Sequence, residues 1–218
     1  MVFFLKIIKY YFLKIIINEG EIMQEHIHHA KSSIKFFNSD EILAQLNFNG
    51  DEVFMDAGCG DGHIAIKAIK DYLPEGLVYA VDSYEPSIKE LDEYKSENNI
   101  GNLININTDI TRDIVQINDD TVDLILMINV VHGFKPSENI DEVIKNFVRI
   151  LKSNGKFAIV DFRPIDLDIG PPVEIKYSSE ELENIFNNQG FKKIYLNEEL
   201  GLDSPNGKSH YLIIFEKE

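Results

Sequence analysis

The stretch Val53-Phe-Met-Asp56-Ala-Gly58-Cys-Gly60-Asp-Gly62-His63 decides the fold of this 218-residue chain. A short apolar run ends in an acid, glycine recurs at every second position, and a segment of helical character begins at Ile64. This order predicts a β-strand, a tight turn and a helix N-terminus. Glycines permit positive φ and leave no Cβ between backbone and ligand, while the N–H groups of a helix start attract anions. The turn predicts a nucleotide or cofactor site; a turn that binds nothing is the alternative.

The glycine spacing separates two classes of cofactor. The dinucleotide fingerprint needs its third glycine three positions after the second, and that position holds His63. The pattern Asp56-x-Gly58-x-Gly60-x-Gly62 instead resembles motif I of the class I S-adenosylmethionine (SAM) dependent methyltransferases. This resemblance implies that Asp56 and the backbone of 58–62 hold the methionine portion of SAM.

Two further acids follow the next two predicted strands. Asp82 ends the apolar run 77–82, twenty residues beyond Gly62, where a βαβ cofactor site needs a carboxylate for the ribose hydroxyls. Asp109 follows the run 103–107, and the resemblance implies that its carboxylate and the next backbone N–H contact the adenine. Each acid has an alternative role, since Asp82 can be a solvated residue at a strand end and Asp109 a helix cap or turn residue.

A fourth strand, 122–128, runs into Asn129-Val-Val-His132, so Asn129 and His132 are predicted to face the methyl donor. His132 is the candidate acid/base residue, because a neutral imidazole can remove a proton from a C–H, O–H or amine. A positioning or capping role is the alternative, since methyl transfer can run on alignment alone. The full predicted cofactor set is Asp56, Ala57, Gly58, Cys59, Gly60, Gly62, Asp82, Ser83, Asp109, Ile110 and Asn129.

The rest of the chain continues a βα alternation. The predicted elements are a short helix 39–46 with Ser39 as N-cap, strands 52–57, 77–82, 103–107, 122–128 and 156–161, helices 62–73, 86–98, 137–151 and 179–189, and strands 191–197 and 210–216 separated by a loop. The pattern and the resemblance imply an α/β, Rossmann-like sheet of seven strands, mostly parallel with an antiparallel last strand, with helices on both faces.

The chain is expected to have three segments. Residues 1–22 are an apolar extension interrupted by lysines, too short in continuous apolar length to span a membrane. We interpret it as a stretch upstream of the true start at Met23; an interfacial helix and a partner-binding extension are the alternatives. The resemblance implies that the N-terminal segment folds over the cofactor, so residues 23–50 are expected to form a lid and helix segment, in which Phe36 and Phe37 cover the cofactor or simply pack. Residues 51–218 form the predicted methyltransferase domain.

The net charge and the cysteine content indicate which classes of partner the protein can bind. A net charge of −16, with lysine and arginine spread along the chain, disfavours nucleic acid and anionic membranes as partners. The single cysteine, Cys59, cannot form an internal disulfide and suits a reducing cytoplasm, where we expect the protein. No metal site is predicted, because His26, His28 and His29 lack further ligands at a recognisable spacing.

The loop after the fifth strand is predicted to shape substrate specificity. Its Gly170-Pro171-Pro172 resembles a loop of the branch similar to the ubiquinone/menaquinone C-methyltransferases. Arg163 in this loop could clamp an anionic group or form a surface ion pair. The predicted function is transfer of the SAM methyl group to a small-molecule acceptor. The alternatives are a SAM-binding sensor or scaffold without turnover and an NAD-dependent oxidoreductase.

Overall fold

The computed structural model describes residues 36–218. The predictions for the extension 1–22, for Met23 and for the three histidines at 26–29 therefore lie outside the described residues. Within the described part, no helix is long and apolar enough to cross a membrane.

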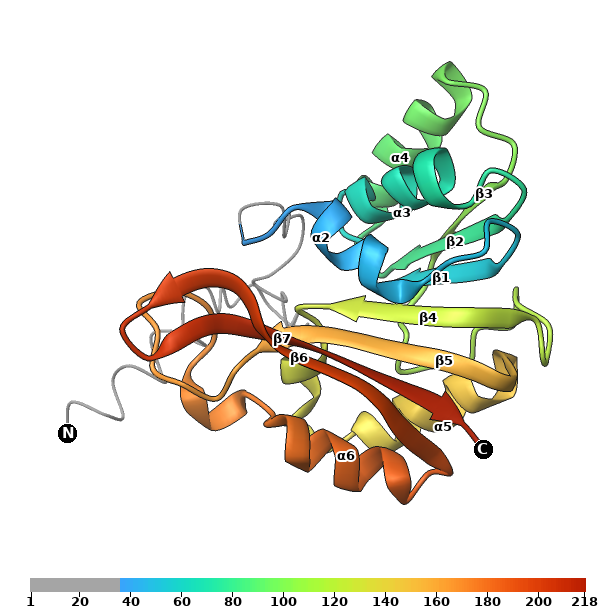
Figure 1. The fold of residues 1–218 in the computed structure, drawn as a ribbon. Coiled ribbons are helices and arrows are strands. Elements are labelled where there is room, and N and C mark those ends of the chain that lie inside the picture. The colour runs from blue at the N-terminus through green and yellow to red at the C-terminus, as the bar shows by residue number, and fades with distance from the viewer. Residues whose placement is uncertain (1–35) are drawn as a thin grey trace, which may run out of the picture.

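A seven-stranded sheet forms the centre of the fold, in the order β3-β2-β1-β4-β5-β7-β6 (Figure 1). All neighbouring strands from β3 to β5 pair in parallel, whereas β7 pairs antiparallel with both β5 and β6. This arrangement confirms the predicted Rossmann-like sheet with one strand reversed. The strands are β1 (Val53–Ala57), β2 (Leu77–Asp82), β3 (Leu103–Asn107), β4 (Val122–Ile128), β5 (Leu151–Phe162), β6 (Phe191–Ser204) and β7 (Gly207–Lys217).

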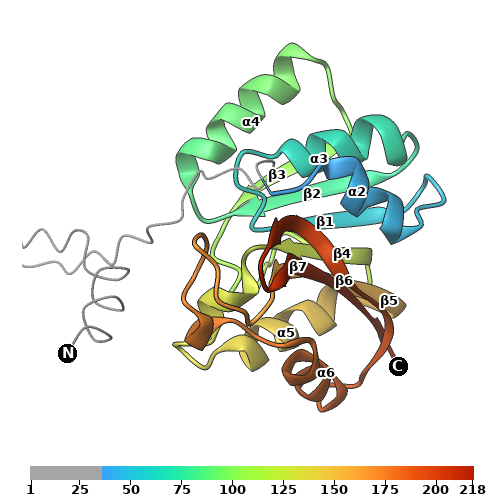
Figure 2. The ribbon, with the colours of Figure 1, turned by 60° about the vertical axis from the view of Figure 1, so that its left-hand side comes forward.

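Helices cover both faces of the sheet. Figure 2 shows α2, α3 and α4 above it and α5 and α6 below it. Each face has its own apolar core, because parallel strands buried on both sides alternate between two layers of side chains. The α-helices are α2 (Ser39–Leu43), α3 (His63–Lys67), α4 (Glu85–Glu97), α5 (Ile140–Ile150) and α6 (Ser179–Asn187); single turns are η2 (Ala44–Leu46), η3 (Ala68–Tyr72), η4 (Val131–Phe134) and η5 (Val173–Ile175).

The amphipathic pattern of α5 shows why a helix forms there. Val143, Ile144, Phe147 and Ile150 are all buried and recur at helical spacing, so one stripe of the helix faces the sheet. Phe147 packs edge-to-face against Phe157 of β5, with ring centroids 5.5 Å apart. Burial of this apolar stripe therefore holds α5 against the sheet.

The first helix begins differently from the prediction. Asn38 is the N-cap of α2, because its backbone is extended and its Oδ1 accepts a hydrogen bond from the Asp40 amide at 3.1 Å. Ser39 is already the first helical residue and is buried. The predicted N-cap was therefore wrong by one position.

The C-terminal hairpin is longer than predicted. β6 and β7 continue to a tight turn at Ser204–Gly207, where a broad loop was expected. Gly201 falls within the predicted loop, but it lies at an irregularity of β6 with φ of 80°, and the ladder resumes beyond it. Glycine in a strand here marks a bulge, and the bulge lets the hairpin extend toward the edge of the sheet that carries the predicted site.

Candidate functional site

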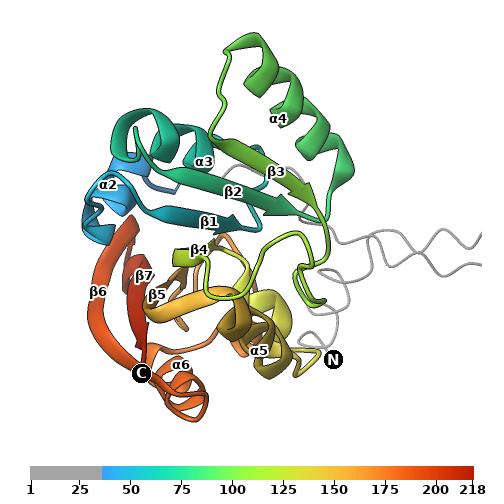
Figure 3. The ribbon, with the colours of Figure 1, turned by 90° about the vertical axis from the view of Figure 1, so that its right-hand side faces the viewer.

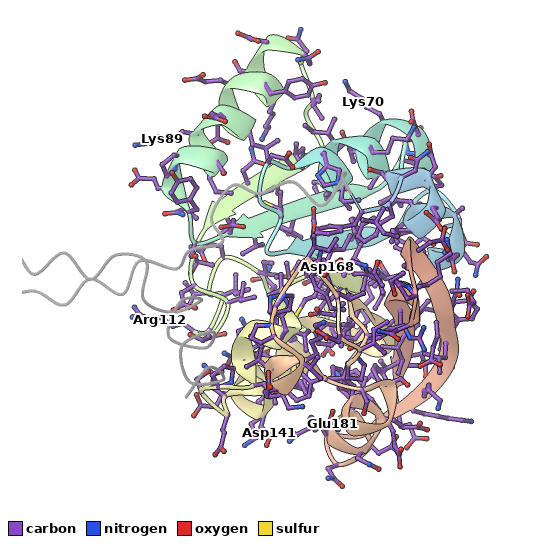
Figure 4. The ribbon with its side chains drawn as sticks, turned by 90° about the vertical axis from the view of Figure 1, so that its left-hand side faces the viewer. Lys70, Lys89, Arg112, Asp141, Asp168 and Glu181 are labelled. Carbon is purple, nitrogen blue, oxygen red and sulfur yellow. The ribbon has the colours of Figure 1, made fainter. Side chains whose placement is uncertain are left out.

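Sheet topology brings the chemistry-bearing residues to one edge. Strands β1, β2, β4 and β5 are parallel, so their carboxyl ends meet there, and the reversed strand β7 begins at the same edge, where His210 pairs with Phe162. Figure 4 looks onto this edge, and Asp168, from the loop after β5, lies over it. Ligands of open α/β sheets bind at this position.

The glycine turn after β1 has the geometry that its sequence predicts. Gly58, Gly60 and Gly62 have φ of 82°, 54° and 74°, a region that favours glycine. A Cβ on Gly58 would lie 2.5 Å from Val130 Cγ2, and one on Gly62 would lie 2.6 Å from Leu91 Cδ1. A Cβ on Gly60 would meet no atom within 4 Å. Gly58 and Gly62 thus allow close packing, while Gly60 faces the open side from which a ligand can approach the backbone.

Asp82 at the end of β2 is tied to this turn. Its Oδ2 accepts a hydrogen bond from the Gly60 amide at 2.9 Å, and its Oδ1 accepts one from the Tyr84 amide at 2.8 Å. The amides of Gly58 and Cys59 donate to Val81 O, so the turn is anchored on β2 by its backbone as well. The structure therefore brings the glycine turn and Asp82 together, as predicted. Ser83, the residue after Asp82, is exposed.

The charged form of the Asp56 carboxyl group is unfavourable in its buried position. Its side chain is buried, and Oδ2 has no hydrogen-bond partner among the described residues. Burial, together with the nearby carboxylates of Asp82 and Asp61, raises the pKa of Asp56 to about 7, against the opposing effects of His63 and the Ala65 amide. A buried oxygen without a partner needs an explanation in a native structure, and a ligand that donates to it would supply one.

The third predicted acid is found in a turn. Asp109 is exposed, and its Oδ1 accepts hydrogen bonds from the amide and the hydroxyl of Thr111 at 2.9 and 2.8 Å. This turn role was the alternative given by its sequence. Ile110 is buried beneath the turn, and Arg112 projects from it into solvent (Figure 4). Contact of Asp109 and Ile110 with adenine stays a prediction.

The loop that carries Asp109 is held from α5. The guanidinium of Arg149 donates to the Asp113 and Asp119 carboxylates and to the carbonyls of Ile114 and Ile117. These bonds fix the connection between β3 and β4 against the helix below. The sequence does not indicate this role of Arg149, because its partners lie 30 or more positions away.

His132 is paired with a carboxylate that the sequence did not assign. Its Nδ1 lies 2.8 Å from Oδ1 of Asp161 at the end of β5, and its backbone amide donates to Oδ2 at 3.0 Å. Both side chains are buried. Although burial raises the pKa of Asp161, the charge and hydrogen bonds of His132 outweigh it and hold the pKa below its usual value. The carboxylate therefore orients the ring, with the Nδ1 proton shared toward Asp161.

A second buried histidine lies beside the first. His210 contacts Phe162, with ring centroids 4.1 Å apart, and Phe162 also lies edge-on to His132 at 5.9 Å. Phe36 and Phe37 pack against His210 at 5.0 and 5.3 Å. These contacts place both phenylalanines over the edge of the sheet; their predicted role as a cofactor cover stays a prediction.

Asn129 does not present its side-chain oxygen to the glycine turn. Its Oδ1 lies 3.1 Å from Nε2 of His210, on the side of β5 and β7. Its backbone is left-handed, with φ of 58°, and its amide donates to Val160 O at 2.8 Å. Asparagine tolerates this backbone better than most residues, which explains its presence at the sharp turn after β4.

The cations of the neighbouring loop bind backbone carbonyls. Arg163 Nη1 donates to Lys208 O at 3.2 Å, and Lys176, which is buried, donates from Nζ to Ile165 O at 2.7 Å. Burial lowers the pKa of Lys176. Arg163 therefore contacts the hairpin backbone in place of the predicted ion pair, and Lys176 closes the loop that contains Gly170.

The part of the chain in the structure contains no cluster of three His, Cys, Asp or Glu side chains that could hold a metal ion. Cys59 is buried in the glycine turn, and burial beside Asp56 raises the pKa of its thiol. A thiol in such surroundings is a poor nucleophile.

The geometry of this edge agrees with a comparison of sequences. A family model described as "Methyltransferase domain" matches residues 48–215. The chain belongs to this methyltransferase domain family. The matched range contains the glycine turn, the acids after β2, β3 and β5, and both histidines. A search among curated proteins finds no match.

Solved structures share the fold of this methyltransferase domain. A SAM dependent methyltransferase from Aquifex aeolicus is 23% identical, with a TM-score of 0.72, and the alignment covers 85% of this chain and 92% of that one. A putative type 11 methyltransferase from Sulfolobus solfataricus is 23% identical, with a TM-score of 0.60 and coverage of 83% and 92%. The [4+2]-cyclase SpnF is 13% identical, with a TM-score of 0.65 and coverage of 81% and 78%. At these identities the likeness supports the fold alone.

Proposed function

We propose that this protein transfers the methyl group of SAM to a small-molecule acceptor. The observation that carries the proposal is the cradle after β1: the open side of Gly60, its amide held by Asp82, and the buried Asp56 oxygen without a partner. An amino-acid ammonium group would supply the donor that Asp56 lacks, and the partly exposed Asp82 has lone pairs left for hydroxyl groups. The residues present thus fit SAM.

Each predicted residue has a role in this proposal. Asp56 and the segment 57–62 hold the methionine portion, Asp82 with Ser83 the ribose, Asp109 and Ile110 the adenine, and Asn129 closes the site at β4. Bound SAM supplies an electrophilic methyl group on a sulfonium. The protein contributes position and an environment that excludes water, since two buried histidines and several aromatic rings surround the acceptor side.

His132 is the proposed general base. Because Nδ1 faces the Asp161 carboxylate, the neutral ring carries its proton there and its lone pair on Nε2. Asp161 would stabilise the imidazolium formed when His132 takes a proton from the acceptor, as a carboxylate does for a histidine base generally. The acceptor would then be a molecule with an ionisable C–H, O–H or N–H group.

Two finer proposals concern the branch of the family and the segments of the chain. The loop containing Gly170, Pro171 and Pro172 supports placement in the branch similar to the ubiquinone/menaquinone C-methyltransferases. The division into an extension at 1–22, a lid and helix segment at 23–50 and a methyltransferase domain at 51–218 is retained as a proposal; the family match begins at residue 48. Because one structural neighbour is named as a cyclase, the test must separate binding from turnover.

The test measures binding first. Calorimetry with the full chain should show micromolar binding of S-adenosylhomocysteine (SAH) and SAM and none of NADH. Asp82→Ala should weaken SAH binding by about tenfold or more, since charge-assisted hydrogen bonds contribute roughly 1.5–3 kcal/mol. Asp51→Ala is the matched control, because Asp51 is exposed just before β1, at the opposite edge of the sheet. Folded protein that binds neither sulfur ligand would contradict the proposal.

Turnover is measured with methyl-labelled SAM and an extract of small metabolites. Transfer of label to a small molecule, reduced by His132→Ala while SAH still binds, would support the base. SAH binding without any label transfer would favour the alternative of a SAM-binding protein without turnover.

A further inference from the structure

A chain of hydrogen bonds connects the C-terminal hairpin with the carboxyl end of β4. The Leu202 amide of β6 donates to Oγ of Ser209 at 2.8 Å, and this oxygen lies 2.7 Å from Nδ1 of His210. Nε2 of the same ring lies 3.1 Å from Oδ1 of Asn129. Leu202 of β6, Ser209 and His210 of β7, and Asn129 directly after β4 thus form one chain of hydrogen bonds. We call this chain the relay; it ends at the candidate site.

Each bond of this relay has one direction. The Asn129 carbonyl oxygen can only accept, so Nε2 of His210 carries the proton and donates. In the neutral ring Nδ1 then accepts, and the Ser209 hydroxyl donates to it while accepting from Leu202. Burial lowers the pKa of His210 to about 4, assisted by His132 and Lys176 and opposed by Asp161, so the ring is neutral at physiological pH.

Packing holds the relay in place. Ser209 and His210 are almost fully buried. A Cβ on Gly201 would lie 2.6 Å from Ser209 Oγ and 2.7 Å from His210 Nδ1, so only glycine permits the hairpin to approach this closely. On its other side the ring of His210 contacts Phe162. The ring therefore has little freedom to rotate or to exchange its tautomer.

The relay fixes which end of the Asn129 amide faces the ligand. With Oδ1 bound to His210, the Nδ2 group points away from it, and within residues 36–218 no atom accepts a hydrogen bond from Nδ2. Asn129 is partly exposed, and the next residue, Val130, lies against the glycine turn. Two N–H donors are therefore available between β1 and β5.

We propose that Ser209 and His210 are positioning residues that lock the Asn129 amide so that its Nδ2 group donates to a carboxylate or carbonyl oxygen of a bound ligand. The proposal rests on the proposed function and adds a ligand group to it. That oxygen belongs either to the amino-acid portion of the cofactor or to the methyl acceptor, and these sources are separated by experiment.

The relay is tested first by nitrogen-15 NMR of the histidine rings in the full chain. We expect His210 as the Nε2–H tautomer, unchanged between pH 6 and 8, and a loss of this single tautomer in Ser209→Ala. A His210 ring that titrates in this range, or that carries its proton on Nδ1, would overturn the relay. This result is independent of whether SAM binds.

The ligand contact is tested with Asn129→Gly, which keeps the left-handed backbone and removes the amide. Asn154→Gly is the matched control, because Asn154 has φ of 61°, is exposed and lies near the amino end of β5. We expect at least about a tenfold loss in Asn129→Gly and none in the control. SAH affinity, the affinity of 5′-methylthioadenosine, which lacks the amino-acid portion, and label transfer from methyl-labelled SAM are measured together.

The three measurements show whether the oxygen that Asn129 binds belongs to the cofactor or to the methyl acceptor. A loss of SAH affinity with methylthioadenosine affinity retained assigns the oxygen to the cofactor. Retained affinity for both, with label transfer reduced tenfold, assigns it to the acceptor. Equal losses for both ligands, or no loss in any measurement, would refute the ligand contact. Wild-type protein that binds no SAH would instead refute the proposed function and leave the NMR result to stand alone.

Discussion

Asp56 allows a prediction in which removal of a proposed ligand-binding charge stabilises the free protein. Its carboxyl group is buried, with one oxygen lacking a partner, and its pKa is raised from 3.8 to about 7. An acid whose folded pKa is raised binds protons more tightly in the folded state. The stability that it contributes is complete below pH 3.8 and is lost as the pH rises through about 7.

The size of this effect follows from the two pKa values. Each tenfold difference in proton affinity corresponds to about 1.4 kcal/mol, so ionisation of the buried group lowers the free energy of unfolding by about 4 kcal/mol in total above pH 7. Asp56→Asn has the same shape and never ionises. In the variant, the amide atom that takes the place of Oδ2 still lacks a hydrogen-bond partner, which costs about 1–3 kcal/mol. We therefore expect the variant to be about 2 kcal/mol more stable than the wild type at pH 8.5.

The measurement is urea unfolding of both proteins without ligand, from pH 5 to 9. The stability difference should grow with pH and level off above pH 8, while SAH affinity should fall in the variant, since the proposed ammonium contact is lost. Asp51→Asn, at the exposed opposite edge, should show neither effect. A variant that is less stable than the wild type at pH 8.5, or a difference that does not change with pH, would refute the reasoning.

Three further predictions concern the turn, the loop and the histidine pair. Gly62→Ala should lower the free energy of unfolding by about 2–3 kcal/mol in urea, because φ is 74° and the new Cβ meets Leu91. Arg149→Met should lower it by about 2–3 kcal/mol by releasing the loop between β3 and β4, and an unchanged urea midpoint would contradict this. Asp161→Asn should lower stability at pH 7 by about 3 kcal/mol and slow label transfer, because the buried carboxylate accepts hydrogen bonds from His132. Since the folded pKa of Asp161 is lowered, its contribution is present above about pH 4 and disappears as the pH falls through the folded value, so the two proteins should converge in acid.

Local pattern predicted the glycine turn and its closeness to Asp82. The strand, glycine turn and helix start lie within eleven consecutive residues, and the order of strands and helices follows from alternating apolar periodicity. Asp56 and Asp82 were identifiable because an apolar strand that ends in an acid is a recognisable signal. Asp161 carries the same signal at the end of β5, and a consistent reading of it would have found the partner of His132.

The arrangement around His132 and His210 depends on contacts that sequence spacing does not encode. His210 lies 81 positions after Asn129 and reaches it only because β7 runs next to β5, which pairs with β4. The register of a hairpin depends on its turn and bulges. The sequence predicts a loop where the structure has the bulge near Gly201. Asp109 shows the reverse case, in which an acid suited to a ligand is also suited to a turn, and only the structure shows the turn.

The reversed strand β7 has a consequence for how the protein is made. It follows β6 in the sequence and lies between β5 and β6, so both of these strands have an unpaired edge until β7 has been synthesised (Figure 3). Strands β1 to β5 precede β7 in the sequence, so His210 joins the sheet only when β7 is added. A chain without β7 would expose unpaired edges of β5 and β6, which promote aggregation, and it would lack His210. Completion of the sheet and completion of the site are therefore the same event in biosynthesis.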